Sequence, residues 1–406
     1  MSYKNLRGTL LGLRNEFSSE LSSLLEFWST SCVDTVNGGF IGAMDHFGQA
    51  DPTANKGCIL NARILWTFSA AYRVTREASY RDTAVRAYEY LKKYFWDHEY
   101  GGLYWELDHR GIPVNTKKQA YVQGFGIYGF SEFYRATGDE ESLRLAQELF
   151  DILEDKFWES KFGGYLEALT EDWMRIDDMR LSQKDLNAPK SMNTHLHILE
   201  PYSNLYRVWP DPKLKTAISS LLQIFCQKIY DKNTRHLDLF FGLDWKSQFH
   251  EVSFGHDIEG AWLMNEASML INDGKVSDQV REVSNSLIES TVREGLDTDG
   301  SLFYERHGSR LDKDKHWWPQ AEAMVGFMES YELHQDLEDL NRVKKVWVFI
   351  KAFLKDKENG EWHWRVNEDN LPVPTDVKAG FWKCPYHNSR AMMELVERID
   401  RILQPV

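Results

Sequence analysis

The stretch FWDHEYGGLYWE, residues 95–106, contains a pattern that recurs along the chain. An aromatic helix end is followed by an acidic turn, one or two glycines and a short strand-like run. Further copies contain Gly38-Gly39, Gly163-Gly164, Gly300 and Gly360, and a degenerate copy spans 229–240. Gly39, Gly102 and Gly164 lie 63 and 62 residues apart, and Gly300 and Gly360 lie 60 apart. Six such units fit into 406 residues, which indicates a repeat architecture.

Each interval between copies holds two stretches of helical periodicity, such as 58–77 with 80–96, 118–137 with 140–158, and 316–335 with 338–356. Gly138-Asp139 predicts a break between two helices. Six helical hairpins could stack as an open solenoid or close into a ring. We expect the closed ring, because the polar and aromatic residues of the inner helices would then converge on one cavity. No Pro-rich or Ser-rich linker divides the chain, so we expect one domain, 1–406.

Composition limits the class of partner. Lys and Arg total 48 against 62 Asp and Glu, and this charge of -14 argues against nucleic acid and anionic membranes as partners. The chain has no apolar run of transmembrane length and no signal-peptide core at its start. Four scattered cysteines without CxxC spacing suit a reducing compartment, so we expect a cytoplasmic protein. The 15 Trp, 18 Tyr and 22 Phe favour sugar stacking.

The segment Gly124–Gly129 matches the dinucleotide pattern G-x-G-x-x-G. That pattern requires a preceding strand and a βαβ unit, whereas the residues on both sides here continue one helix. We therefore expect these glycines to serve close helix packing.

Three segments contain histidine in unusual surroundings. Asn193 and His197 are i,i+4 neighbours on one helix face. His256 and Glu259 are i,i+3 neighbours, which predicts that the carboxylate holds the imidazole. His387 follows a proline that suits a helix start. A metal site formed by His256, Glu259 and His197 has the right ligand types but nonspecific spacing, so we expect no metal.

Two further inner helices contain unusual residues. Trp318 and Glu322 are i,i+4 neighbours, and Trp382 would stand at the rim just before His387. Arg63 lies in an otherwise apolar helix, where it is costly unless it has a buried anionic partner.

Together these residues suit proton transfer at C2 of an open-chain aldose. Inversion of C2 through a planar enediolate requires an acid/base group on each face with a pKa near the working pH, and two histidines fit. A cation must stabilise the charge that develops on O1 and O2, and Arg63 fits. The chemistry requires no cofactor.

Five segments resemble those of the cellobiose 2-epimerases, which belong to the N-acylglucosamine 2-epimerase superfamily: KGCILNARILWTFSAAYR, KSMNTHLHILEPY, GHDIEGAWLM, WWPQAEAMVGF and WKCPYHNSRAMMELVERI. The resemblance covers essentially the whole chain. It implies an all-α fold, an (α/α)6 barrel of six helical hairpins with short β segments in the connecting loops.

The resemblance also implies roles. His256 and His387 would remove and return the C2 proton, and His197 would assist ring opening and proton traffic. Glu259 would orient His256, and Arg63 would hold the enediolate. The positions that match substrate contacts are Tyr121, Asp185, Asn193, Trp262, Trp318, Glu322 and Trp382.

The expected reaction is reversible C2 epimerisation of the reducing-end glucose of β-1,4-linked disaccharides, cellobiose or lactose, through a cis-enediol(ate). Alternatives are a mannose 2-epimerase, a mannose-fructose isomerase or a noncatalytic sugar binder. An inverting glycoside hydrolase would need two carboxylates, from Asp185, Glu259 and Glu322, roughly 6.5–9.5 Å apart. We expect a monomer by default, and we expect loops 171–189 and 307–316 to decide how far the cleft extends.

Overall fold

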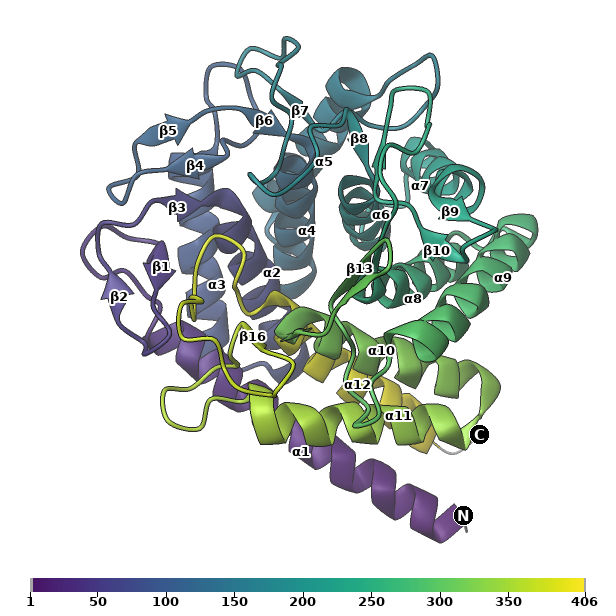
Figure 1. Ribbon diagram of the computed structural model, residues 1–406. Helices are drawn as coiled ribbons and strands as arrows, with labels where there is room; N and C mark the ends of the chain where they lie inside the picture. Colours follow the sequence, from purple (N-terminus) through teal and green to yellow (C-terminus); the bar gives the residue numbers. More distant parts are fainter. Residues whose placement is uncertain (1–2, 405–406) are drawn as a thin grey trace.

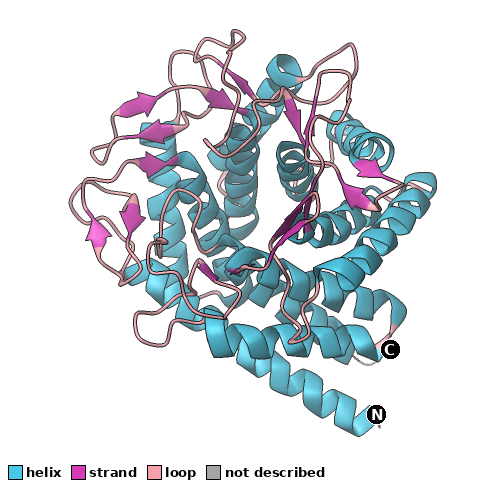
Figure 2. Cartoon of the chain, viewed as in Figure 1, coloured by secondary structure: helices cyan, strands magenta, loops and turns pink. Residues whose placement is uncertain are grey.

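The computed structural model describes residues 3–404, which are largely helical (Figures 1 and 2). Within them, six inner helices surround the barrel axis: α2 (Cys58–Thr75), α4 (Ala120–Thr137), α6 (Met192–Tyr206), α8 (Phe254–Ile271), α10 (Trp317–His334) and α12 (Tyr386–Leu403). Six outer helices cover them: α1 (Tyr3–Thr30), α3 (Ala78–Tyr90), α5 (Glu140–Ile152), α7 (Pro212–Ile224), α9 (Gly274–Ser290) and α11 (Leu337–Phe349). The predicted (α/α)6 barrel is confirmed.

The ring is closed by contacts between the first and last inner helices. Each inner helix contacts the next in sequence order, and α12 contacts α2, which excludes the open solenoid. The outer helices α3, α5, α7, α9 and α11 each pack on the inner helix that precedes them, while α1 packs on α12. The first helix of the chain therefore completes the sixth pair.

Five outer helices continue into one turn of π-helix: η1 (Leu91–Phe95), η2 (Leu153–Phe157), η3 (Phe225–Ile229), η4 (Thr291–Gly295) and η5 (Ile350–Leu354). The expected short β segments follow in the loops: β1 (Ala43–Met44), β2 (Ala50–Asp51), β3 (Lys56–Gly57), β4 (Glu106–Leu107), β5 (Pro113–Asn115), β6 (Lys118–Gln119), β7 (Ala168–Leu169), β8 (Lys190–Ser191), β9 (Tyr230–Asp231), β10 (His236–Leu237), β11 (Phe240–Phe241), β12 (Glu251–Ser253), β13 (Glu305–His307), β14 (Arg310–Asp312), β15 (Lys315–His316) and β16 (Arg365–Val366).

Antiparallel pairs join neighbouring repeats, as in β6–β7, where Lys118 is opposite Leu169 and Gln119 is opposite Ala168. The same arrangement recurs in β3–β4–β5, β8–β11, β12–β13–β14 and β15–β16. Because β3, β6, β8, β12 and β15 each end where an inner helix begins, these loops lie at the N-terminal ends of the inner helices.

In most repeats, a buried lysine forms an ion pair with the acidic residue of the turn. Lys118 donates to Asp97 at 2.6 Å and to the Gly101 carbonyl at 2.9 Å, and both charged side chains are fully buried. Lys56, Lys190 and Lys378 make the equivalent pairs with Asp34, Glu159 and Asp356. In these four repeats, a lysine from the segment leading to the next inner helix thus binds the acidic turn.

In α4, α6 and α10, the fourth residue of the helix holds the turn after the glycines. In α4 this residue is Gln123, whose side chain accepts from the Leu103 N–H at 2.8 Å, and Gln320 of α10 does the same for Leu302 at 2.7 Å. His195 occupies this position in α6, and its Nε2 accepts from the Tyr165 N–H at 2.9 Å. His195 is therefore a structural residue, in contrast to its neighbour His197.

The dinucleotide-like glycines lie inside α4, as expected, and Gly124 shapes the site. Pro201 has no N–H for the carbonyl of His197, and α6 departs from helical geometry there, with φ −87° and ψ 15°. A Cβ atom at Gly124 would overlap this carbonyl oxygen. Gly124 and Pro201 together let α4 approach the bend that carries His197.

Candidate active site

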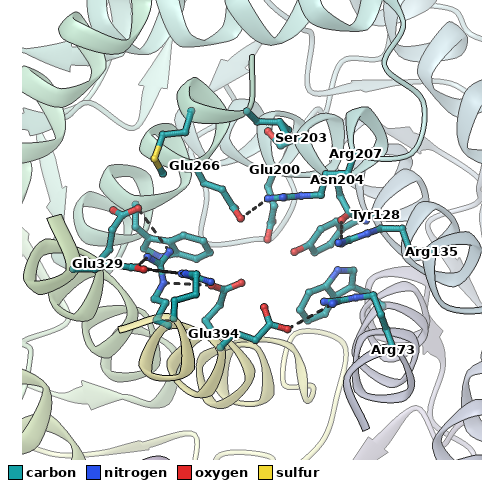
Figure 3. A pocket seen from close by; sticks show the side chains of 18 of the residues that line it. Arg73, Tyr128, Arg135, Glu200, Ser203, Asn204, Arg207, Glu266, Glu329 and Glu394 are labelled. Atoms are coloured by element: carbon teal, nitrogen blue, oxygen red, sulfur yellow. Dashed lines mark hydrogen bonds and ion pairs between the residues drawn. The ribbon is translucent and has the colours of Figure 1, made fainter. Parts of the chain in front are cut away.

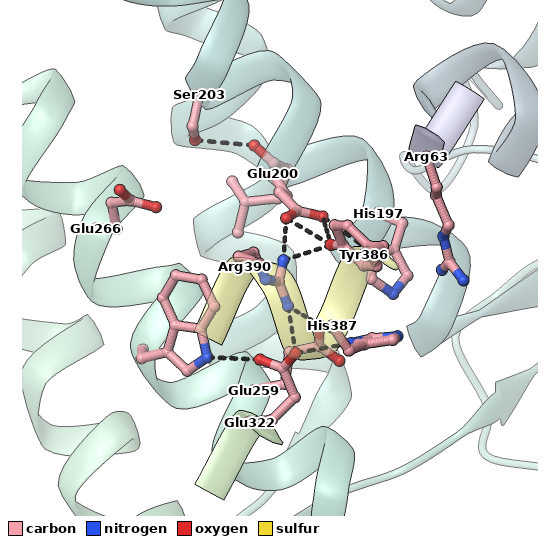
Figure 4. Close-up of polar contacts among 12 residues, drawn as sticks. Arg63, His197, Glu200, Ser203, Glu259, Glu266, Glu322, Tyr386, His387 and Arg390 are labelled. Carbon is pink, nitrogen blue, oxygen red and sulfur yellow. Dashed lines mark hydrogen bonds and ion pairs between the residues drawn. The ribbon is translucent and has the colours of Figure 1, made fainter. Parts of the chain in front are cut away.

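Five of the predicted site residues lie close together in Figure 4: Arg63, His197, Glu259, Glu322 and His387. Helix register explains much of this. The sixth residue of α2, α4, α6, α8 and α10 is, in order, Arg63, Phe125, His197, Glu259 and Glu322. The repeat thus places five of these side chains in one layer.

His387 has its own carboxylate partner. Its Nδ1 contacts Glu322 Oε1 at 2.7 Å, and Glu322 is fully buried and also accepts from the Trp262 indole N–H at 3.1 Å. A carboxylate at this nitrogen favours the Nδ1–H tautomer and leaves Nε2 with a free lone pair. Burial and the positive charge of Arg63 hold the pKa of His387 well below its usual range. Glu322 therefore holds the His387 imidazole, and its expected contact with substrate stays a prediction.

His197 forms a second dyad, with Glu200. Its Nδ1 lies 3.1 Å from Glu200 Oε2, and both side chains are 2% exposed. Burial lowers the pKa of His197 to about 4, so this imidazole is neutral near pH 7. Its neighbour on the same face, Asn193, keeps its Oδ1 buried and without a hydrogen bond.

His256 is not held by Glu259, so that prediction is wrong. The Nδ1 of His256 contacts Ser253 Oγ at 2.8 Å, and burial lowers its pKa to about 3. Its ring lies 4.7 Å from that of Trp318, which in turn lies 5.6 Å from the ring of His387. Trp318 therefore stands beside both histidines, and its stacking on sugar stays a prediction.

Glu259 instead bonds to Arg390, which comes from α12. Arg390 Nη2 donates to Glu259 and to Glu322, at 2.6 Å in both cases, and Arg390 Nη1 pairs with Glu200. Burial and the charge of Glu322 raise the pKa of Glu259 well above its usual range, and its second oxygen has no hydrogen bond. Burial also raises the pKa of Glu322, and the charge of Arg390 opposes this effect at both carboxyls.

Arg63 has aromatic rather than anionic neighbours. Its Nη2 donates to the Tyr121 hydroxyl at 2.7 Å and its Nη1 contacts Cys384 Sγ at 3.8 Å. The guanidinium lies 4.3 Å from the ring of Phe125 and 4.6 Å from that of Tyr386. Arg63 forms no ion pair with a carboxylate of residues 3–404, so its charge is available to an oxyanion.

Three other residues that we expected to contact substrate, Trp382, Trp262 and Asp185, have different surroundings. Trp382 is partly exposed beside Tyr121, with 5.8 Å between ring centroids. Trp262 is 1% exposed and lies 4.8 Å from the guanidinium of Arg390, and its contact with substrate stays a prediction. Asp185 lies in loop 171–189, where it accepts from the Ser182 N–H at 2.7 Å, and burial raises its pKa.

Glu259, Glu322 and His387 form a cluster whose side chains are of types that can bind a metal ion. Ligand atoms of Glu259, Glu322 and His387 lie within 4.8 Å of one another. Arg390 already neutralises the carboxylates and would oppose a second cation there. The metal set considered from sequence, with His256 and His197, differs from this cluster.

The barrel also has a cavity of about 540 Å³ at the opposite, C-terminal end of the inner helices (Figure 3). It is lined by paired charges, such as Arg207 with Glu266 at 2.5 Å and Arg398 with Glu332 at 2.8 Å. Arginines near helix C-termini offset the negative ends of the helix dipoles. Glu200 lines this cavity too and so separates it from the histidines.

Comparison with known proteins identifies the family. The family model of N-acylglucosamine 2-epimerase (GlcNAc 2-epimerase) matches residues 39–391. The chain belongs to this family. It is 47% identical to the cellobiose 2-epimerase of Bacteroides fragilis over 387 residues, which cover 95% of this chain and 98% of that protein.

Other family members support the same placement. The structure of cellobiose 2-epimerase from Spirochaeta thermophila superimposes with a TM-score of 0.93 at 39% identity, covering 98% of this chain and 99% of that one. A D-mannose isomerase of Marinomonas mediterranea is 24% identical over 398 residues, which cover 94% of this chain and 96% of that protein.

Sequence reasoning missed four residues that organise the site: Ser253, Glu200, Tyr386 and Arg390. Glu200 could have been found, because it lies three residues after His197, the same spacing that was applied to His256 and Glu259. Arg390 lies three residues after His387, but its partners come from three other helices, so no local spacing reveals them.

Proposed function

We propose that the protein is a cellobiose 2-epimerase, an isomerase that inverts C2 of the reducing-end glucose of β-1,4-linked disaccharides. The observation that carries this proposal is that the imidazoles of His256 and His387 both contact Trp318, with 4.7 and 5.6 Å between ring centroids. The charge of Arg63 acts on His387 and lowers the pKa of that imidazole. The 47% identity to a cellobiose 2-epimerase supports this substrate class.

In the proposed reaction, one of the two histidines removes the C2 proton and the other returns a proton to the opposite face. The lowered pKa values mean that both imidazoles are neutral before reaction, rather than near half-protonation as the sequence suggested. A neutral imidazole can accept the C2 proton. Negative charge on the enediolate then raises the pKa of the facing imidazole, which lets it take up a proton from solvent and deliver it to C2, while the first histidine returns the abstracted proton to solvent.

Charge stabilisation comes from two sources. Arg63 can donate to O1 and O2, since its Nε has no hydrogen bond and its aromatic surroundings exclude water. The six inner helices also direct their N-termini toward the site, and the positive ends of their dipoles favour a developing anion. His197 is placed beside Tyr121, with 5.1 Å between rings, where it can assist ring opening.

The alternatives fit less well. A mannose isomerase would use the same bases, but the relative of that name is only 24% identical. An inverting hydrolase needs two free carboxylates separated by a water, whereas Glu259 and Glu322 share one Arg390 nitrogen.

No helix within residues 3–404 is long and apolar enough to span a membrane. The monomeric state and the cytoplasmic location stay predictions.

Proton NMR of cellobiose with the enzyme in D2O tests the proposal. We expect a growing signal from a mannose reducing end, deuterium at C2 and an intact glycosidic bond. Ketose formation from mannose would favour the isomerase, and release of glucose would favour a hydrolase. An unchanged disaccharide would contradict the proposal.

A further inference from the structure

Arg390 contacts three buried carboxyl side chains of the site, Glu200, Glu259 and Glu322. Its side chain is 1% exposed, and its guanidinium is enclosed between the rings of Tyr386, at 4.3 Å, and Trp262, at 4.8 Å. One nitrogen pairs with Glu200 and the Tyr386 hydroxyl, and the other bonds to Glu259 and Glu322 (Figure 4). The planar, rigid guanidinium can bridge these groups in a way that a lysine ammonium cannot.

Two of the bridged carboxylates each hold a histidine. Glu200 contacts the Nδ1 of His197, and Glu322 contacts the Nδ1 of His387. An ionised carboxylate only accepts hydrogen bonds, so each of these nitrogens must carry the hydrogen. Both rings then present an unprotonated Nε2, which is the atom that can accept a proton.

The charge of Arg390 favours the ionised form of both carboxylates. It contributes to lowering the pKa of Glu200 to about 2 in spite of complete burial. Burial raises the pKa of Glu322, and Arg390 is the main opposing charge there. Without the guanidinium, desolvation would favour the protonated acids. A protonated carboxyl can donate to Nδ1, which would move the ring hydrogen to Nε2 and remove the free lone pair.

We propose that Arg390 is a positioning residue that sets the tautomer of His197 and His387 together, by bridging Glu200 and Glu322. This inference rests on the proposed epimerase function for its kinetic consequence, but the tautomers themselves can be observed without turnover. Arg390 does not touch the reacting atoms in this scheme. Its role differs from that of a buried ion pair that only stabilises the fold.

The test compares Arg390→Met with Arg398→Met, a matched control. Arg398 lies two turns further along α12, is 4% exposed and pairs with Glu332 at 2.8 Å, away from the histidines. The tautomers are assigned by two-bond ¹H–¹⁵N NMR of ¹⁵N-histidine-labelled enzyme. The kcat and KM for C2 epimerisation of cellobiose are measured on the same preparations.

For Arg390→Met, we expect Nε2–H signals for both His197 and His387 and a loss of kcat of about 100-fold or more, with KM changed less than about threefold. For Arg398→Met, we expect a lower Tm with unchanged tautomers and kcat. Unchanged tautomers in a folded Arg390→Met protein would overturn the inference. If both variants change activity and stability alike while both tautomers stay, the role of Arg390 is structural.

Arg390→Lys provides the second variant should Arg390→Met not fold. A single ammonium cannot span both carboxylates, so we expect one histidine to change tautomer and kcat to fall less than in the Met variant. Wild-type tautomers and kcat in Arg390→Lys would also overturn the inference. A wild-type enzyme that shows no epimerisation would contradict the proposed function alone, because the tautomer comparison still decides the role of Arg390.

Discussion

Replacing His195 with Gln should separate the structural from the functional histidines of α6. Gln already stands at the equivalent position in α4 and α10, where its side chain accepts from a backbone N–H as His195 does. The substitution preserves the hydrogen bond to Tyr165 and removes a titratable group. We therefore expect epimerase activity within about twofold of wild type, whereas His197→Gln should lose most of its kcat.

The magnitude of the stability effect follows from the pKa of His195. The side chain is fully buried, and burial lowers this pKa to about 3, against about 6.5 in the unfolded chain. As the pH falls below 6.5, only the unfolded state takes up the proton, so stability is lost. Linkage gives a loss of about 2 kcal/mol between pH 7 and pH 5 from this residue.

Urea unfolding at pH 7 and pH 5, followed by tryptophan fluorescence and circular dichroism, measures this effect. We expect His195→Gln to lose about 2 kcal/mol less than wild type over this interval. Parallel stability changes in the two proteins would refute the reasoning on burial of a neutral His195. A large loss of activity in His195→Gln would refute its structural role.

Three further outcomes are expected. Glu322→Gln should lower kcat about 100-fold with little change in KM, because an amide can donate to His387 Nδ1 and favour the Nε2–H tautomer. Steady-state kinetics checks this, with Glu329→Gln as a buried control on the same helix. Equal losses of kcat in the two variants would argue against the prediction. Ser253→Ala should lower kcat about tenfold by removing the one hydrogen bond to His256 Nδ1; unchanged kcat would show that Ser253 does not orient the ring. The kcat/KM of the wild type should stay level from pH 8 down to about 5, since His256 and His197, with pKa values of about 3 and 4, become protonated only at lower pH; a midpoint near 6.5 would contradict these shifts.

The sequence predicts the barrel well because its evidence is periodic. Glycines at regular spacing and paired helical stretches define the repeat, and the repeat places Arg63, His197 and Glu322 at the same level of the ring. The contact between α12 and α2 closes the ring, and α1 pairs with α12. Both contacts join opposite ends of the chain, so the spacing within one repeat does not show them.

The site was harder to predict because its decisive contacts are between helices. Glu259 lies one turn from His256, but Arg390 of α12, 131 positions away, offers a charge-assisted bond that a neutral imidazole does not. His256 instead uses Ser253, at the end of the preceding strand. Helical spacing shows which side chains can meet, but it does not show which competing partner from another helix is stronger.

The most direct test of the two-histidine scheme is C2 proton exchange in D2O by His256→Asn and His387→Asn, with cellobiose and with glucosyl-mannose. If each histidine serves one face of C2, each variant should exchange the C2 proton of only one of the two sugars. The two variants should differ in which sugar that is, and neither should form the other epimer. Exchange of both sugars by one variant, or continued epimerisation without either histidine, would contradict the account.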